Sequence, residues 1–513
     1  MASYDEKIRE LREKIKKAEL GGGIEKIEKQ HKKGKYTARE RIEKLLDKDS
    51  FVEFDQLITS RVPEFSEFYS DGVVTGYGTI NERRIFVYAQ DATILGGSLG
   101  EMHGKKIAKC IELAVKTGCP IIGLIDSGGA RIQEGVDALA AAGEILRRNV
   151  IASGVIPQIA VIVGPGAGIA AYSPALQDFI IMVKGIGYLF TTGPSVVKSM
   201  LGEDVSPDDL GGAIMHAEKS GTAHFIVDTE DEAFMFVRKL LSYLPSNNVE
   251  LPPKTSSTGE YDVPEVMDYV PVDSDETYDI HDVINIIFDK DSFLEVQEFF
   301  GKSVVVGFAR LDGWVVGIVA NNPAVNLGML NIDSGDKVAR FIRFCDAFNI
   351  PLITLVDSPH PVVGKNEASR GVIRHTAKVM YAYAESTIPK ITVILRRAIG
   401  GGYIAMGSKH LGADLVFAWP TAEIAVLEDK AAVDILYRRE LEKAENKEEM
   451  YRKLLSEYRE KYSNPYIAAS RGYIDKIIEP SQTRRKIISA LKMLMIKYEL
   501  KLEEFRKHGN IPL

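Results

Sequence analysis

Cysteine is scarce in this chain: only Cys110, Cys119 and Cys345 occur among 513 residues, and all three lie inside apolar patterns. Because no CxxC pair is present, neither a disulfide framework nor a zinc ribbon is expected, and we predict three core thiols. The formal net charge of −8 argues against nucleic acid as a general partner. The sequence also shows no Ser-His-Asp set, no paired carboxylates and no metal-ligand cluster, so we predict no metal site.

We expect neither a secretory leader nor a membrane span. The first residues, MASYDEKIRELREK, carry too many charges for a signal peptide. Residues 149–177 contain no charge and are long enough to span a bilayer, but Pro157, Gln158 and Pro165 interrupt the segment. We therefore expect a buried strand with a loop there, no stable membrane insertion, and a cytoplasmic enzyme.

The most informative stretch is a buried strand that leads into small residues. Ile159 to Val163 is an unbroken apolar run, which is typical of a strand covered on both faces. The segment GPGAGIAA follows at 164–171, and small residues let the backbone turn sharply or approach a ligand. Backbone N–H groups gathered at such a turn can hold a developing oxyanion. The alternative use of these glycines is close packing of a helix on a sheet.

The chain contains a second version of this element, at Ile388 to Tyr403. Other segments recur at nearly the same spacing. Residues 76–91 return at 307–322, and residues 120–127 return at 351–358 (351 − 120 = 231). Pro157 returns at Pro389 (389 − 157 = 232), and residues 47–51 return at 289–293 (289 − 47 = 242). One spacing held over several strands, with drift only from loop lengths, indicates a duplicated domain. The composition of residues 245–274, rich in Pro, Ser, Thr and Asn, marks a linker. We predict an α/β chain with domains at 1–248 and 276–513, joined by a linker at 249–275.

The densest positive patch lies near the N-terminus, around Lys35 and Arg39. Thr37 and Glu40 have the spacing of a capping box, so a helix is expected to begin there. The patch is either a solvated helix face or a site for the phosphates of a large anionic ligand. A further candidate is the loop after the strand at 121–125, since ligands gather at the carboxyl ends of such strands.

Together these residues resemble the carboxyltransferase (beta) subunit of biotin-dependent acyl-CoA carboxylases of the propionyl-CoA carboxylase type. The resemblance covers nearly the whole chain and includes, in order, GKYTARERIEKLLD, DGVVTGYG, GGSLGE, DSGGARIQEGVDALA, YSPAL, TGPSVVK, LSYLPSNN, ARFIRFCDAFNIP, SKHLGADLVFAWPTAEIAV, NPYIAASRG and HGNIPL. Subunits of related decarboxylases, such as that for methylmalonyl-CoA, are similar as well.

The resemblance implies two tandem crotonase-like (ClpP/crotonase) domains, usually assembled as a homohexamer. It implies an acyl-CoA substrate bound by the first half, and biotin carried covalently on a partner protein and bound by the second half. The implied partners are a biotin carboxyl carrier protein and a biotin carboxylase subunit. The implied reaction moves a carboxyl group from carboxybiotin to the α-carbon of a short-chain acyl-CoA through an enolate, which backbone amides stabilise.

The resemblance also implies site residues. Gly168 and Ile169 are expected to hold the enolate oxygen, and Gly401 and Gly402 the biotin ureido oxygen. The expected acyl-CoA-binding residues are Lys35, Arg39, Gly96, Gly97, Ser127, Gly128, Gly129, Ala130 and Tyr172. The expected biotin-binding residues are Pro359, His360, Gly364, Gly371, Leu427 and Glu428.

The sequence departs from the family pattern where chemistry is expected. Ile169 stands where the family has the second glycine of a pair, and HPVV at 360–363 replaces GFLP. Leu427 to Asp429 replace a Met-Gly-Pro segment. Three interpretations follow: an active carboxyltransferase with an altered pocket, a biotin-dependent decarboxylase subunit, or a paralogue that binds CoA thioesters without biotin chemistry. A purely structural assembly protein would leave the retained glycines unexplained.

Overall fold

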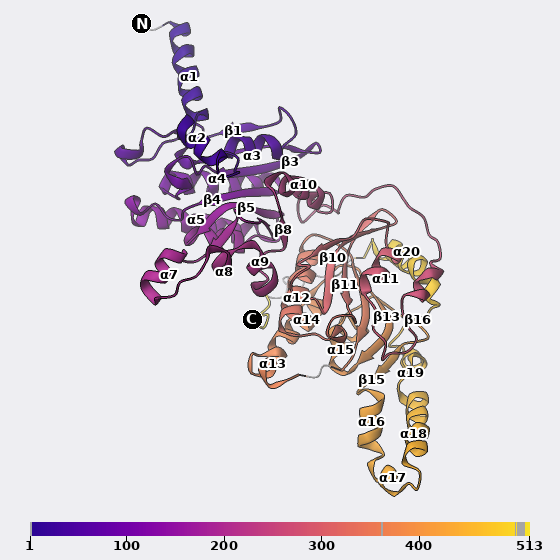
Figure 1. The fold of residues 1–513 in the computed structure, drawn as a ribbon. Helices are drawn as coiled ribbons and strands as arrows, with labels where there is room; N and C mark the ends of the chain where they lie inside the picture. Colours follow the sequence, from indigo (N-terminus) through magenta and orange to yellow (C-terminus); the bar gives the residue numbers. More distant parts are fainter. Residues whose placement is uncertain (1–2, 361–362, 498, 500–507) are drawn as a thin grey trace. The chain divides into compact units, whose positions relative to one another are not determined.

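The computed structural model describes residues 3–360, 363–497, 499 and 508–513. Its residues divide into two compact units, Met1–Glu250 and Leu251–Leu513 (Figure 1). From Leu251 onward, the segment that the composition marks as a linker lies along the second unit: the N–H of Thr255 donates to the carbonyl of Gly313, and that of Gly259 to Asp312 Oδ1. The predicted boundaries at 248 and 276 stay a prediction.

The first unit is built on one twisted sheet with the strand order β1-β2-β3-β4-β5-β6-β8, in which β7 also pairs with β5. Its strands are β1 (Val52–Phe54), β2 (Val73–Ile80), β3 (Arg83–Gln90), β4 (Ile121–Ser127), β5 (Gln158–Ala167), β6 (Phe179–Val183), β7 (Tyr188–Phe190) and β8 (Phe225–Val227). Pairing is antiparallel between β1, β2 and β3 and parallel from β3 onward. The sheet is therefore mixed, with antiparallel pairs at the β1 edge and parallel pairs from β3 to the β8 edge.

Helices surround this sheet in the order expected for βαβ crossovers. They are α1 (Tyr4–Glu19), α2 (Ile24–His31), α3 (Ala38–Leu45), α4 (Glu101–Thr117), α5 (Val136–Ala152), α6 (Ile169–Ala175), α7 (Pro194–Leu201), α8 (Pro207–Gly211), α9 (Ala213–Met215) and α10 (Glu230–Leu241). The predicted capping box is confirmed, because Thr37 Oγ1 accepts from the N–H of Glu40 while the Glu40 side chain accepts from that of Thr37. Helix α3 therefore begins where its sequence predicts.

The second unit repeats this plan with the order β16-β14-β13-β12-β11-β10-β9, in which β15 also pairs with β13. Its strands are β9 (Leu294–Val296), β10 (Val304–Leu311), β11 (Trp314–Asn321), β12 (Leu352–Ser358), β13 (Lys390–Ile399), β14 (Leu415–Ala418), β15 (Glu423–Ala425) and β16 (Lys476–Ile477). Its helices are α11 (Ile280–Ile287), α12 (Ile332–Ala347), α13 (Lys365–Ser369), α14 (Val372–Glu385), α15 (Gly400–Ala405), α16 (Asp429–Leu436), α17 (Arg438–Lys443), α18 (Lys447–Tyr462), α19 (Pro465–Ser470) and α20 (Thr483–Leu494). Figure 1 shows α16, α17 and α18 projecting from the body of this unit.

The predicted duplication is confirmed down to an irregularity of register. Between β4 and β5, Ile125 pairs with Ile162, whereas Ser127 pairs with Gly166. The pairing of β12 and β13 skips in the same way, from Val356 opposite Ile394 to Ser358 opposite Ala398. Such a bulge re-aims the residues beside it, and both copies carry it directly before the glycine turn.

Apolar runs explain why the central strands are buried. Every residue of β4, β6, β12 and β13 is buried, which fits strands that helices cover on both faces. The three cysteines are buried and free, as predicted. Among the described helices, none has the length and apolar character needed to cross a membrane.

Candidate active site

The two strand-to-helix junctions have the same backbone geometry. Gly168 precedes α6 with φ of 57°, and Gly400 opens α15 with φ of 55°, at a spacing of 400 − 168 = 232. This region of φ strongly favours glycine, because a Cβ there meets the neighbouring carbonyl oxygen. The glycine of each turn therefore makes the sharp change of direction from strand to helix.

The amides that follow these glycines are the available donors. The N–H of Gly168 already donates to the carbonyl of Phe190 at 2.9 Å, so Gly168 shapes the turn and is not a free donor, contrary to expectation. The first-turn amides of Ile169 and Ala170 have no carbonyl within α6 to bond. Their duplicated counterparts are Gly401 and Gly402.

Gly402 is also needed for packing. A Cβ placed on it would lie 2.3 Å from Ser358 Oγ and 3.1 Å from the carbonyl oxygen of Pro359, so α15 rests directly on the end of β12. Gly401, in contrast, is exposed and faces a cavity. Both uses of glycine that the sequence left open, close packing and approach to a ligand, therefore occur in one turn.

In each unit, a buried aspartate stands near the end of the strand that pairs with the one leading into the turn, Asp126 in β4 and Asp357 in β12. Asp126 Oδ2 accepts from Arg41 Nη1 at 2.9 Å, and Asp126 Oδ1 accepts from Lys35 Nζ at 2.8 Å. In the second unit, the two carboxylate oxygens of Asp357 accept from Arg396 Nε and Arg397 Nε, both at 2.8 Å. Both aspartates accept hydrogen bonds from two buried cations. In the first unit these cations come from the N-terminal segment, and in the second unit they come from the neighbouring strand β13.

These contacts correct part of the predicted phosphate site. Lys35 is buried and ion-paired to Asp126, and burial lowers the pKa of its ammonium group, so it is not the surface cation that we expected. Arg39 is partly exposed and makes a bidentate pair with Glu53 at 2.7 and 3.0 Å. The neighbouring Lys32 and Lys33 are exposed, and they are the cations of this segment that remain available to an anionic ligand.

The structure brings together the predicted loop residues of the first unit. The N–H of Gly128 donates to the carbonyl of Gly96 at 3.1 Å, and a Cβ on Gly97 would lie 2.2 Å from the carbonyl oxygen of Asp126. Ser127 Oγ accepts from the N–H of Gly129, and Ala130 forms a parallel bridge with Leu99 at the same place. The two loops thus form one surface, which adjoins β5 because a Cβ on Gly129 would lie 2.9 Å from the carbonyl oxygen of Ala167.

A cavity of about 700 Å³ lies beside α6, the helix that follows the first turn. Tyr172 on α6 lines it, together with Phe190 from β7 and Met200 from α7. His216 closes one side, where its Nε2 is hydrogen-bonded to the carbonyl of Leu189 at 2.7 Å and burial lowers the pKa of its imidazole. The Gly96 and Gly128 loops are not among its described lining residues.

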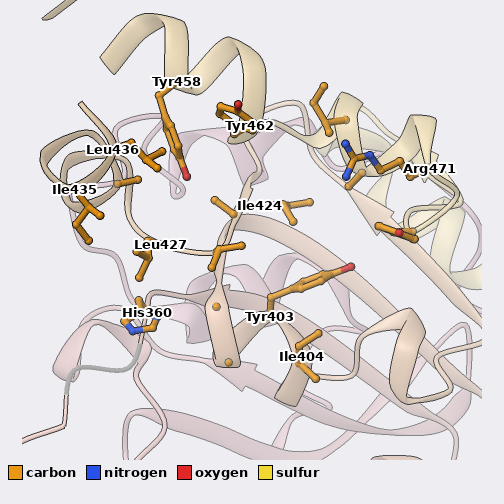
Figure 2. A pocket seen from close by; sticks show the side chains of 18 residues that line it. His360, Tyr403, Ile404, Ile424, Leu427, Ile435, Leu436, Tyr458, Tyr462 and Arg471 are labelled. Atoms are coloured by element: carbon orange, nitrogen blue, oxygen red, sulfur yellow. The ribbon is translucent and has the colours of Figure 1, made fainter. Parts of the chain in front are cut away.

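A larger cavity, of about 870 Å³, adjoins the second turn (Figure 2). Gly400 and Gly401 line it. Figure 2 shows Tyr403 and Ile404 on one side of it and Leu436, Tyr458 and Tyr462, from α16 and α18, on the other. The other lining residues are His360, Ile424, Ala425, Val426, Leu427, Ala432, Ile435, Ile467, Ala468, Arg471 and Tyr473. The walls are largely apolar, with tyrosine hydroxyls, one arginine and one imidazole as their polar side chains.

The predicted biotin-side residues divide into two groups. His360 and Leu427 line this cavity, Glu428 Oε1 accepts from the N–H of His360, and Pro359 packs beneath the turn. Gly364 and Gly371 do not belong to the described lining; they precede α13 and α14 instead.

The wall formed by α16, α18 and α19 was not predicted from the sequence. The charges of residues 431–462 suggest exposed helices, yet Tyr451, Leu454, Leu455, Tyr458 and Tyr462 recur every three or four residues. That spacing is the signal of an apolar helix face. In the structure, Leu454 and Tyr458 form a small core with Ala432 and Val433 of α16.

Comparison with known proteins identifies this arrangement. The family model described as the carboxyl transferase domain matches residues 29–511. The chain belongs to the carboxyl transferase family. Its described residues contain no group of three or more His, Cys, Asp or Glu side chains that could hold a metal ion.

The relatives of this carboxyl transferase match it from end to end. It is 52% identical over 517 residues to the carboxyltransferase subunit of propionyl-CoA carboxylase of Haloferax mediterranei, covering 100% of both chains. It is 51% identical to the methylmalonyl-CoA decarboxylase subunit alpha of Veillonella parvula, again over 100% of both chains. The structure of transcarboxylase 12S, a hexamer with methylmalonyl-coenzyme A and methylmalonic acid bound, superposes with a TM-score of 0.97 at 46% identity, covering 100% and 99% of the two chains. The predicted fold of two tandem crotonase-like domains is confirmed.

Proposed function

We propose that this carboxyl transferase moves a carboxyl group between biotin on a carrier protein and the α-carbon of a short-chain acyl-CoA such as propionyl-CoA. The observation that carries the proposal is the pair of duplicated glycine turns, each followed by two first-turn amides. Gly400 and Gly401 of the second turn line one cavity, and α6, which follows the first turn, lines another. Biotin, when bound, supplies the nitrogen that carries the carboxyl group. The chain supplies binding and electrostatic stabilisation.

The second cavity fits a bicyclic ring with a ureido group. Its apolar walls suit the hydrocarbon and thioether part of such a ring, and its polar groups are few, as in most small-molecule sites. The amides of Gly401 and Gly402 would hold the ureido oxygen, and Leu427 would pack against the ring. An amide donor of this kind contributes about 3–4 kcal/mol where it stabilises a developing oxyanion.

In the first unit, the amides of Ile169 and Ala170 would hold the thioester oxygen as the enolate develops. Tyr172 and the apolar cavity beside it would receive the acyl group. The surface formed by Gly96, Gly97 and the 127–130 loop would accept the pantetheine chain, because Gly96 and Gly128 are exposed there. Lys32 and Lys33 would attract the CoA phosphates.

A decarboxylase is the second candidate. The sequence identity favours it: the chain is 51% identical to the Veillonella parvula decarboxylase subunit and 52% identical to the Haloferax mediterranei carboxylase subunit. Both reactions need the same two turns, since each passes through an acyl-CoA enolate. We also infer a homohexamer, as in transcarboxylase 12S, together with a biotin carrier and a biotin carboxylase as partners.

Reconstitution tests the proposal. The chain is combined with a biotinylated carrier and a biotin carboxylase, and bicarbonate fixation into acetyl-, propionyl- and butyryl-CoA is measured. Carboxylation of at least one of these substrates is expected. Acyl-CoA binding without carboxylation of any of them, and without biotin-dependent decarboxylation of methylmalonyl-CoA, would identify a paralogue that has lost the chemistry.

A further inference from the structure

One histidine lies directly against the second glycine turn. His360 follows the end of β12, and its backbone N–H donates to Glu428 Oε1 at 3.0 Å. This bond ties the backbone of the loop after β12, at His360, to the loop after β15. The ring lines the 870 Å³ cavity beside Gly400 (Figure 2).

The imidazole touches the turn itself. A Cβ placed on Gly400 would lie 2.5 Å from His360 Nδ1, so only a glycine at 400 leaves room for the ring. His360 Nδ1 is buried and has no hydrogen-bond partner among the described residues. A buried polar atom without a partner is unfavourable, and in native proteins it often marks a functional position.

The duplicated unit shows what His360 adds. Its counterpart in the first unit is Gly129 (129 + 231 = 360), which has a φ of 97° and no side chain. The equivalent loop of the first unit therefore carries no imidazole at this position. In a cavity with largely apolar walls, one added polar group has a strong influence on how a ligand is oriented.

We propose that His360 is a further ligand-binding residue that recognises a cyclic urea. With the ureido oxygen at the amides of Gly401 and Gly402, an imidazole nitrogen accepts a hydrogen bond from the ring N–H that does not carry the carboxyl group. The amides and the imidazole then bind two different atoms of the same ring. Two contacts, unlike one, fix which ring nitrogen faces the acyl group. This inference rests on the proposed function.

The experiment uses the full-length chain and measures the affinity of free biotin and of its derivative methylated on the N–H that does not carry the carboxyl group. The variants are His360→Ala, which removes the acceptor, and His360→Asn, whose amide oxygen can replace Nδ1. The wild type is expected to bind biotin about 3- to 10-fold more tightly than the methylated derivative, the range for one neutral hydrogen bond. His360→Ala should remove this discrimination, and His360→Asn should restore most of it.

A matched control is His375→Asn. This histidine lies on α14, where its Nδ1 is hydrogen-bonded to Asp336 Oδ1 at 2.7 Å, and it is not a described lining residue of the cavity. The control should keep the wild-type discrimination within 2-fold. Equal discrimination by the wild type and His360→Ala would overturn the inference alone, provided that both bind biotin. A wild-type chain that neither binds biotin nor transfers a carboxyl group would instead contradict the proposed function.

Discussion

Gly401→Val tests the proposal that the second unit binds biotin while the first unit binds acyl-CoA. Gly401 is exposed in the first turn of α15 and faces the second cavity, so a valine side chain would project into the space proposed for the ureido ring. The backbone N–H survives, but the ligand oxygen is held away from it. The fold should survive too, because valine has a slightly better helix propensity than glycine.

The expected magnitude follows from the lost contact. Keeping the oxyanion from one backbone donor costs about 2.7–4 kcal/mol, which is a decrease in kcat of about 10²- to 10³-fold. The first-unit turn and its cavity are built from other residues, so the KM for acyl-CoA should stay within about 2-fold. The free energy of unfolding should change by less than about 0.5 kcal/mol.

The assay compares the wild type, Gly401→Val and the exposed-helix control Gly143→Ala in the reconstituted transfer reaction. Circular dichroism melting of each variant checks the fold. Retention of transfer within 5-fold in Gly401→Val would refute the reasoning about this amide. A selective loss of acyl-CoA binding would show that the roles of the two halves are reversed.

Three further outcomes test stability. In α5, a Cβ on Gly143 would meet no atom within 4 Å, so Gly143→Ala should stabilise the protein by about 0.5–1 kcal/mol. In α4, a Cβ on Gly104 would lie 2.7 Å from a side chain of α5, so Gly104→Ala should destabilise the protein by about 1–3 kcal/mol. Urea unfolding measures both changes. Asp357→Asn should cost about 3–5 kcal/mol, because it leaves two buried arginines without their carboxylate. The hydrogen bond to Glu295 and a second carboxylate raise the pKa of His281 to about 9, so His281→Gln should lose about 1 kcal/mol at pH 6 and almost nothing at pH 10.

Control measurements distinguish these specific effects from a nonspecific loss of stability. Asp275→Asn breaks an exposed ion pair with Lys430 and should change the free energy of unfolding by less than about 1 kcal/mol. The sign of the His281 effect follows from its raised pKa: the protonated ring stabilises the fold below its unfolded pKa, and this contribution disappears as the pH rises through about 9. An effect of equal size at pH 6 and pH 10 would contradict an origin in the charge of this imidazole.

The sequence by itself determined the repeated architecture. A constant spacing near 231 fixed the order of equivalent strands, because each strand needs a local apolar run and each turn needs glycine. The glycine turns at Gly168 and Gly400 could also be predicted from the sequence, since a backbone with positive φ strongly favours glycine.

Only the tertiary structure decided which groups are free. Lys35 looked like a surface cation and is instead paired to Asp126, which lies 91 residues away in the chain. The N–H of Gly168 looked available and is bonded to Phe190, while His360 proved to have a ring nitrogen without a partner within the part of the chain that the structure describes. A hydrogen-bond partner distant in sequence leaves no local pattern. The composition of the site can therefore be read from the chain, but its unsatisfied donors and acceptors depend on how the chain packs.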